Sequence, residues 1–178
     1  MRVPLRWLRD YVDIELEPEQ LADVLTMSGT KVEGVDRVGS GLRRITAGRA
    51  VSVTPHPESD RLRIVILDMG PRQAPRRVVT GATNVAEGCI VPVVLAGGSL
   101  ADGEEIGEAE FAGVRSEGML LSAKELGVSD DNSGILLLPD SVQPGDDIVD
   151  SLNLRDDVLE LEITPNRPDC LCMVGVAR

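Results

Sequence analysis

The first 39 residues contain two stretches in which apolar residues recur at helical spacing. A stretch in which apolar and polar residues alternate follows them. Pro4 predicts the start of a helix, because its fixed φ suits the first helical position and its missing N–H would have no partner there. A second helix is expected from Pro18, with Gly29 available as its left-handed cap. Residues 31–38 alternate as a strand does. The apolar positions of these three elements are Leu5, Leu8, Val12, Leu21, Val24, Leu25, Val32, Val35 and Val38.

Trp7 and Tyr11 widen the apolar face of the first helix. We expect this face, which includes Leu8 and Val12, to be buried in a core rather than to bind a ligand. Two short helices and one strand cannot bury a core on their own. We therefore expect residues 1–39 to pack against another part of the chain, for which its C-terminal end is the candidate.

Between residues 40 and 150 the pattern changes to short β-branched runs separated by glycine. This stretch holds 14 of the 18 glycines of the chain. Short strands with regular turn signals are typical of an all-β barrel or sandwich, and a count of five favours the small Greek-key barrel known as the OB-fold. The five expected strands are residues 45–53, 62–68, 76–80, 90–95 and 135–138.

The remainder of this middle stretch has weaker signals. Ser122 and Glu125 have the spacing of a capping box and predict a short helix, which Gly127 ends after about one turn. Residues 81–88 and 97–118 carry no clear strand pattern, so we expect loops there.

The last part of the chain again contains both a strand-like alternation and a helical spacing of apolar residues. Residues 158–163 alternate as a strand, residues 164–167 predict a turn, and Pro168 predicts the start of a helix. This helix would still be in progress at Arg178, so we expect the natural chain to continue. Its apolar positions are Leu171, Val174 and Ala177.

Together these patterns predict an α+β chain with two domains. Residues 1–39 and 151–178 are expected to form one discontinuous α/β domain, truncated at its C-terminus. Residues 40–150 are expected to form a five-stranded OB-fold barrel inserted into it. Such an insertion is compatible with folding because the two ends of a barrel can lie close together.

The charge of the chain limits its partners. The formal net charge is −12, with −3 in residues 1–39, −7 in residues 40–150 and −2 in residues 151–178. Affinity for nucleic acid comes largely from Lys and Arg that displace counterions from phosphates. We therefore expect no strong binding to a duplex and no DNA partner.

Cysteine usage and hydropathy indicate the compartment. Cys89, Cys170 and Cys172 are too few for a disulfide framework, which fits a reducing, cytoplasmic location. No stretch has the length of a signal peptide or of a membrane span, so no membrane partner is expected. Cys170 and Cys172 point apart on a helix and lack further ligands, so we expect a buried thiol and a polar one without zinc.

The only histidine, His56, lies in the loop Pro55–Leu62, which runs directly into an apolar stretch. His56 with Asp60 resembles a general base and the carboxylate that orients it. However, two prolines with Glu-Ser-Asp are what a tight loop between strands uses, and no nucleophile stands in a recognisable context. We therefore expect no catalytic residues and no metal ligands in this chain.

Arginines gather around the second and third expected strands. Arg61 and Arg63 share one face of the second strand, whereas Arg76 and Arg77, preceded by Arg72, begin the third. Because OB barrels often bind single strands on the face of these two strands, Arg61, Arg63, Arg76 and Arg77 are candidate RNA-binding residues. The alternative is that they are solvated edge charges that discourage aggregation. Phe111, the only aromatic residue of the barrel, offers little stacking surface.

Six motifs occur in an order that resembles one known family. They are VPLRWLRDYV, LTMSGTKVEGV, HPESDRL, VVTGATNV, GVRSEGMLLSAKELG and LEITPNRPDC. This order is similar to that of the N-terminal part of bacterial phenylalanyl-tRNA synthetase β subunits, over essentially the whole chain. The resemblance implies a discontinuous first domain with an inserted tRNA-binding-type OB domain.

The resemblance also implies the activity of a larger enzyme. The parent class II synthetase joins phenylalanine to tRNA with ATP and magnesium, as an α2β2 assembly with a separate α subunit. Its aminoacylation site lies on the α subunit, and editing and anticodon contacts lie in β domains beyond Arg178. We therefore expect this chain to have a structural and auxiliary tRNA-binding role and no cofactor of its own. The alternatives are an autonomous tRNA-binding OB module acting in trans and a small hydrolase using His56.

Five positions depart from the family pattern. Thr80 and Leu121 stand where relatives often have cysteine, and Cys172 replaces a common serine. Phe111-Ala112-Gly113 replaces the more usual Leu-Arg-Gly. The missing arginine at Ala112 removes one phosphate contact that the family would offer.

Overall fold

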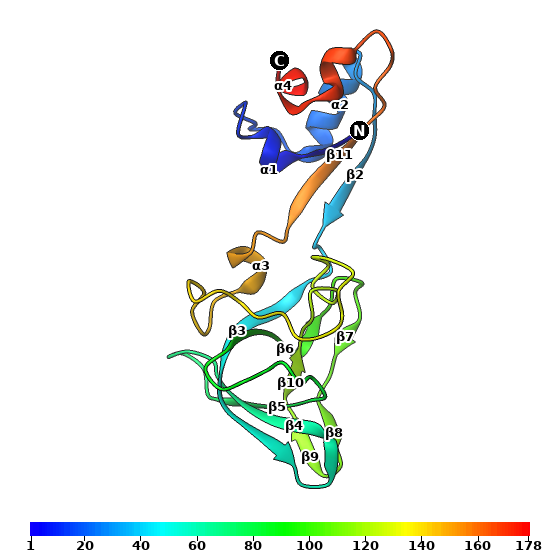
Figure 1. The fold of residues 1–178 in the computed structure, drawn as a ribbon. Coiled ribbons are helices and arrows are strands. Elements are labelled where there is room, and N and C mark those ends of the chain that lie inside the picture. The colour runs from blue at the N-terminus through cyan, green and yellow to red at the C-terminus, as the bar shows by residue number, and fades with distance from the viewer. The chain divides into compact units, whose positions relative to one another are not determined.

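The computed structural model of residues 1–178 divides into two units (Figure 1). Unit 1 combines the two ends of the chain, Met1–Val38 and Arg155–Arg178. Unit 2 is the continuous segment Gly39–Leu154. None of the helices in either unit has the length and apolar content needed to span a lipid bilayer.

Unit 1 is built on a three-stranded antiparallel sheet in the order β1-β11-β2. Its central strand belongs to the C-terminal segment, with Leu159 opposite both Val3 and Val35. The end of the chain therefore supplies the middle of the sheet that the first 38 residues begin. The predicted strands at 31–38 and 158–163 are confirmed, whereas β1 has only three residues and was not predicted. The strands are β1 (Arg2–Pro4), β2 (Val32–Val38) and β11 (Asp156–Leu161).

The two N-terminal helices begin where the prolines predict. α1 is Leu5–Leu8, with Pro4 as its N-cap. α2 is Pro18–Met27, and Gly29 follows it with a φ of 100°, in the left-handed region that glycine enters without strain.

The buried face of α1 is narrower than predicted. Leu5 and Leu8 are buried and Val12 packs against them, but Trp7 and Tyr11 are 52% and 49% exposed, so the prediction that these aromatics are core residues is wrong. The reason is that α1 has a single turn, so helical periodicity does not extend to residue 11. The buried core of unit 1 is formed by Val3, Leu5, Leu8, Leu159, Leu161 and Met173.

The predicted C-terminal helix is interrupted. A 3₁₀ helix, η1 (Pro168–Leu171), and a short α-helix, α4 (Met173–Ala177), are separated by Cys172, whose backbone is extended at φ −141° and ψ 159°. This break changes the buried face: Met173 is buried, whereas Leu171 is 65% exposed. The prediction of one continuous helix across residues 168–177 is therefore wrong.

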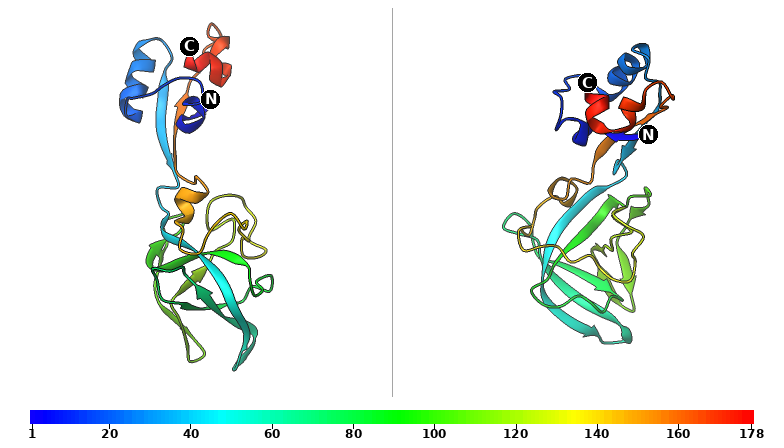
Figure 2. Two further views of the ribbon diagram at one scale, coloured as in Figure 1. Left: turned by 90° about the vertical axis from the view of Figure 1, so that its left-hand side faces the viewer. Right: turned by 45° about the horizontal axis from the view of Figure 1, so that its top comes forward.

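Unit 2 is an antiparallel sheet that curls strongly, as the two views of Figure 2 show. Its main path has the order β10-β6-β3-β4-β5. Two clusters of buried aliphatic side chains fill it, and four of the five predicted strands are confirmed. These four are β3 (Arg43–His56), β4 (Ser59–Asp68), β5 (Arg76–Thr80) and β6 (Ile90–Ser99).

The fifth strand was predicted at the wrong place. Residues 135–138 form no continuous strand: the side chain of Asn84 accepts from the N–H of Ile135 at 3.1 Å and donates to its C=O at 2.8 Å, and Leu138 forms only an isolated bridge to Ile90 of β6. The strand that pairs with β6 is instead β10 (Gly118–Leu120). A Cβ on Gly118 would lie 2.4 Å from the carbonyl oxygen of Val94, so this close pairing requires glycine.

The stretch 97–118, expected as loop, contains three short strands. Ser122 and Glu125 make the hydrogen bonds of the predicted capping box, but the segment forms one hydrogen-bonded turn and no helix. A short helix near residue 148 follows Asp147, whose carboxylate caps it. These elements are β7 (Glu105–Ile106), β8 (Ala109–Phe111), β9 (Val114–Ser116) and α3 (Ile148–Ser151).

The turn between β8 and β9 offers a test of local strain. Its two residues, Ala112 and Gly113, have φ values of 44° and 78°, the pattern of a type I′ turn that favours Asn-Gly. We predict that Ala112→Asn raises the free energy of unfolding by about 0.5–1 kcal/mol, because asparagine tolerates the left-handed region better than alanine. Urea denaturation measures the change, and Ala109→Asn, in the adjacent extended strand, is the matched control. Equal effects of the two substitutions would argue against the strain at Ala112.

Candidate nucleic-acid interface

Two neighbouring strands, β4 and β5, carry the four arginines predicted to bind RNA. They pair antiparallel, with Arg63 opposite Thr80 and Leu67 opposite Arg76. Paired residues project to the same side of a sheet, and the sides alternate along each strand. Since Val65 and Leu67 are completely buried, the side of β4 that contains residues 63, 65 and 67 faces the core.

This register separates the arginines. Arg63 and Arg76 lie at the two ends of the core-facing side, whereas Arg77, opposite Ile66, lies on the other side. Arg63 and the partner of Arg76 are four residues apart on β4, which corresponds to about 13 Å at ~3.3 Å per residue. The structure therefore brings Arg61 near Arg63 and Arg76 near Arg77, and it does not join the two pairs in one patch.

The first pair lies at the beginning of β4. Arg61 is exposed and its guanidinium makes no hydrogen bond or ion pair within the chain. Arg63 is half-buried, and its Nη1 is 3.5 Å from the carbonyl oxygen of Thr83. Arg61 is therefore the cation of this pair that is available to an external anion.

Glu117 organises the second pair. Its backbone N–H donates to the carbonyl oxygen of Arg77 at 2.9 Å, and the N–H of Arg77 donates back to the Glu117 carboxylate at 2.9 Å. The same carboxylate forms an ion pair with Arg76 at 3.1 Å. The N–H of Arg77 and the guanidinium of Arg76 lower the pKa of Glu117, against a smaller opposing effect of burial. The guanidinium of Arg77 stays free of internal partners.

A notch of about 430 Å³ opens beside this second pair. Arg76, Arg77 and Arg115 line it together with Glu117. Arg115 forms an ion pair with Glu108, which raises the pKa of Arg115. Two of these guanidinium groups are paired with carboxylates, Arg76 with Glu117 and Arg115 with Glu108, so the unpaired Arg77 gives the notch its net positive charge, which suits a phosphate. Arg115 was missed because it lies within residues 97–118, where the sequence shows no clear strand pattern.

A groove of about 500 Å³, lined by apolar side chains and by polar ones that include Glu125, adjoins the end of β5. Its walls include Leu62 and Val79 of the paired strands, Phe111 at the end of β8, and Met119 of β10. Asn132 and Ser133 add polar groups to the same walls. The sequence pattern could not predict this groove, because five separate segments form it.

The only histidine is buried and its two ring nitrogens are both engaged. His56 is 4% exposed, its Nδ1 accepts from the N–H of Glu58 at 3.1 Å, and its Nε2 lies 2.9 Å from the carbonyl oxygen of Phe111. Asp60 makes no hydrogen bond to the ring. A buried imidazole with both nitrogens in use holds loops together and offers no accessible base.

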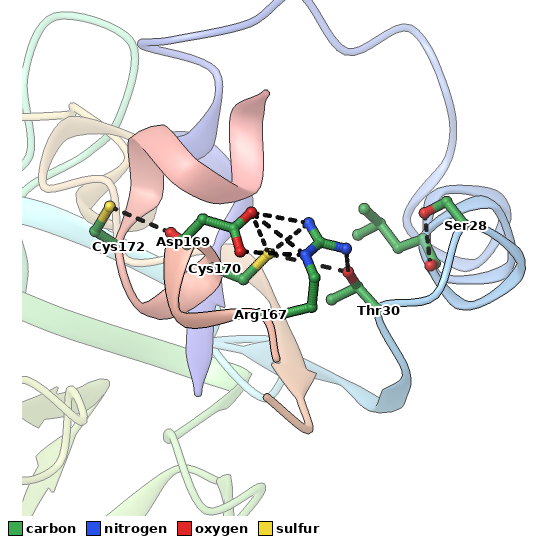
Figure 3. Close-up of polar contacts among 7 residues, drawn as sticks. Ser28, Thr30, Arg167, Asp169, Cys170 and Cys172 are labelled. Carbon is green, nitrogen blue, oxygen red and sulfur yellow. Dashed lines mark hydrogen bonds and ion pairs between the residues drawn. The ribbon is translucent and has the colours of Figure 1, made fainter. Parts of the chain in front are cut away.

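Unit 1 has a separate polar cluster, which Figure 3 shows around Arg167. The guanidinium donates to the carboxylate of Asp169, to Thr30 Oγ1 at 3.1 Å and to Cys170 Sγ at 2.9 Å. Asp169 raises the pKa of Arg167, and Arg167 in turn lowers that of Asp169. Cys170 is buried and Cys172 is exposed, as the sequence predicted. Since Thr30 and Arg167 belong to the two separate segments of unit 1, this cluster ties those segments together.

Comparison with known proteins identifies the class. Residues 45–147 match the family model described as "Putative tRNA binding domain". This match covers more than half of the chain and most of unit 2, so the chain belongs to this family of tRNA-binding domains.

More specific relatives match the whole chain. It is 49% identical to the phenylalanine–tRNA ligase β subunit of Moorella thermoacetica, 44% to that of Anaeromyxobacter dehalogenans and 40% to that of Syntrophus aciditrophicus. Each comparison includes 100% of this chain and 22% of the relative. The resemblance carried by the six motifs is therefore confirmed, and the chain spans about a fifth of the length of these relatives.

Two solved structures show partial similarity. A methionyl-tRNA synthetase-related protein from Pyrococcus horikoshii superposes with a TM-score of 0.42 at 21% identity, over 57% of this chain and 84% of that one. The CsaA chaperone protein from Picrophilus torridus gives a TM-score of 0.43 at 18% identity, over 57% and 87%.

The role of Glu117 gives a pH-dependent prediction. Because the pKa of Glu117 is lowered in the folded state, its charge stabilises the fold above the usual glutamate pKa, and this stabilisation is lost as pH falls through the lowered value. We predict that Glu117→Gln reduces the free energy of unfolding by about 1 kcal/mol at neutral pH. The difference from the unsubstituted chain should shrink in acid.

Urea denaturation between neutral pH and about pH 3 measures this difference. Glu104→Gln is the control, since Glu104 is exposed and its carboxylate has no partner within the chain. A loss of stability for Glu117→Gln that stayed the same down to the lowest pH would show that the charge does not matter.

Proposed function

We propose that this chain is the N-terminal, auxiliary tRNA-binding part of a phenylalanine–tRNA ligase β subunit. The observation that carries the proposal is the match of residues 45–147 to the tRNA-binding family within a chain that is similar over its whole length to these β subunits. In this proposal unit 2 contacts tRNA, and unit 1 connects it to the remainder of the longer subunit.

The proposed architecture is an OB-type barrel inserted into a discontinuous α/β domain. The strand order β10-β6-β3-β4-β5 supports it, because the two edge strands also meet through the backbone bond from Glu117 to Arg77. An order in which the third strand approaches the last one is that of a five-stranded Greek-key barrel. The division into units at residues 38–39 and 154–155 supports the insertion.

The proposed interface combines the groove at the Leu62 end of β4 with the arginines at both ends of the pairing between β4 and β5. Arg61, beside Arg63, binds a phosphate at one end of β4, and Arg77, beside Arg76, binds one at the other. Arg63 and Arg76, about 13 Å apart along the strands, suit a backbone whose phosphates are spaced by several ångström, with a base directed into the groove beside Leu62 and Val79. Since unit 2 carries a net charge of −7, such contacts remain weak and strongly dependent on salt.

The activity of the complete enzyme is part of the same proposal. A phenylalanine–tRNA ligase attaches phenylalanine to tRNA, and we assign the aminoacylation site, with its ATP and magnesium, to the α subunit of an α2β2 assembly. The chain itself then needs no cofactor and supplies no catalytic residue. Its contribution is to hold part of the tRNA outside the catalytic centre.

Charge reversal tests the interface. We predict that Arg61→Glu and Arg77→Glu each weaken binding of a tRNA-Phe transcript about 5- to 20-fold at low salt and reduce the slope of log K against log salt by about 1. Fluorescence anisotropy at two or more salt concentrations measures both quantities. Arg43→Glu is the matched control, because Arg43 is exposed and lies at the start of β3, outside the groove and the notch.

Three outcomes are informative. If Arg43→Glu weakens binding as much as the other two, only the net charge matters and the interface is wrong. If the chain does not bind tRNA at all, the proposed function of unit 2 is wrong. Nanomolar binding by these 178 residues alone would favour an autonomous module that acts in trans.

A further inference from the structure

Phe111 has an unusual position in unit 2. It is the only phenylalanine of the chain, and the other two aromatic residues, Trp7 and Tyr11, belong to unit 1. Its side chain is 40% exposed at the end of β8 and lines the groove beside β5. A large apolar ring that is partly open to solvent beside a groove is available for contact with a ligand.

His56 fixes the backbone of Phe111. The N–H of Glu58 can only donate, so Nδ1 of His56 must accept and carries no proton. The neutral ring then has its proton on Nε2, which donates to the carbonyl oxygen of Phe111 at 2.9 Å. Because the ring is buried, this bond is shielded from competing water.

The bond connects two hairpins. His56 is the last residue of β3, in the hairpin with β4, and Phe111 is the last residue of β8, directly before the turn to β9. A hairpin of two three-residue strands has little stability of its own. Its tip, and with it the Phe111 ring, therefore depends on an anchor such as the His56 bond.

The geometry points to Phe111 as a stacking platform for one unpaired RNA base, with His56 as the residue that positions it. The inference rests on the proposed tRNA-binding function and specifies its ligand as an unstacked base in a single-stranded or looped segment. Stacking on an aromatic face needs no positive charge, which suits a unit whose net charge is −7.

The groove also offers a group that can bind the edge of the same base. The side chain of Asn132 lines the groove and makes no hydrogen bond within the chain. A primary amide has two donors and an acceptor, which matches the polar edge of any base. Met119 lines the same groove and gives the opposite face of the base a polarisable apolar contact.

A single fluorine label tests the stacking directly. Incorporation of 4-fluorophenylalanine into the 178-residue chain gives one ¹⁹F signal, because the sequence has one phenylalanine. Titration with tRNA-Phe and with short single-stranded oligoribonucleotides should shift this signal, with saturation at the same concentration as the binding curve. A duplex of the same sequence, whose bases are already stacked, is the control and should leave the signal in place.

Matched substitutions measure the contribution of the ring. Phe111→Leu keeps an apolar side chain and removes the aromatic face, and we expect it to weaken RNA binding about 5- to 20-fold, the lower part of the usual range for stacking on one ring. Phe111→Tyr keeps the aromatic face and should bind within about twofold of the unsubstituted chain.

The positioning role of His56 needs a variant that keeps its other bond. His56→Asn retains an acceptor near Nδ1 for the N–H of Glu58 and loses the donor to Phe111. It should weaken binding about as much as Phe111→Leu and broaden or move the ¹⁹F signal in the absence of RNA. The double variant should be no weaker than either single one, since both remove the same contact.

The outcomes separate this inference from the proposed function. Binding that responds to Arg61→Glu and Arg77→Glu but not to Phe111→Leu would overturn the stacking platform alone. Stacking without any effect of His56→Asn on the free signal or on affinity would overturn the positioning role. Absence of all tRNA binding would overturn both the inference and the proposed function.

Discussion

The reciprocal contact between Glu117 and Arg77 is the constraint on which unit 2 depends. The sheet has two edge strands, β5 and β10, whose unpaired backbone groups would otherwise be open to solvent or to other chains. Between these two edges, three hydrogen bonds replace regular strand pairing. The N–H of Glu117 donates to the carbonyl oxygen of Arg77, and the N–H of Arg77 donates to the Glu117 carboxylate. The N–H of Val79 donates to Ser116 Oγ at 3.0 Å. Side chains thus complete a ladder that three-residue strands are too short to form.

The contacts of Glu117 with Arg76 and Arg77 also determine which cations the candidate interface presents. Glu117 neutralises Arg76 and fixes the backbone of Arg77, so the free guanidinium of Arg77 projects from a rigid strand. At the other end of β4, Arg61 is free and Arg63 is near Thr83. An acidic unit therefore presents a few positioned cations and a groove with both apolar and polar walls, which is the arrangement expected of a weak, salt-dependent RNA contact.

Unit 1 depends on the pairing of two separate segments, because neither segment forms a sheet without the other. β11 pairs with both β1 and β2, and the Arg167 cluster connects the turn before η1 to Thr30. The exposed ion pairs around β2 and β11, such as Lys31 with Glu162, add little stability by comparison with the buried cluster around Leu159. The aliphatic core and the shared central strand therefore hold the ends of the chain together.

The sequence by itself determined the local elements whose signals lie within a few residues. Pro4 and Pro18 start helices and the alternating runs form β2 to β6, because these elements depend on local backbone preferences. The motifs from VPLRWLRDYV to LEITPNRPDC indicated the family, because this assignment depends on residue order alone.

Only the tertiary structure decided which side of a strand meets the core and which short segments become strands. Arg63 and Arg77 lie on opposite sides of their sheet because the strand register fixes the faces. Of residues 135–138, Ile135 is bound by the side chain of Asn84 and Leu138 forms only an isolated bridge to Ile90, whereas Gly118 lies in a strand that approaches Val94 closely. The groove beside Phe111 and the hydrogen bond from His56 are likewise formed by segments far apart in the chain. A local sequence pattern cannot predict which residues of such segments come into contact.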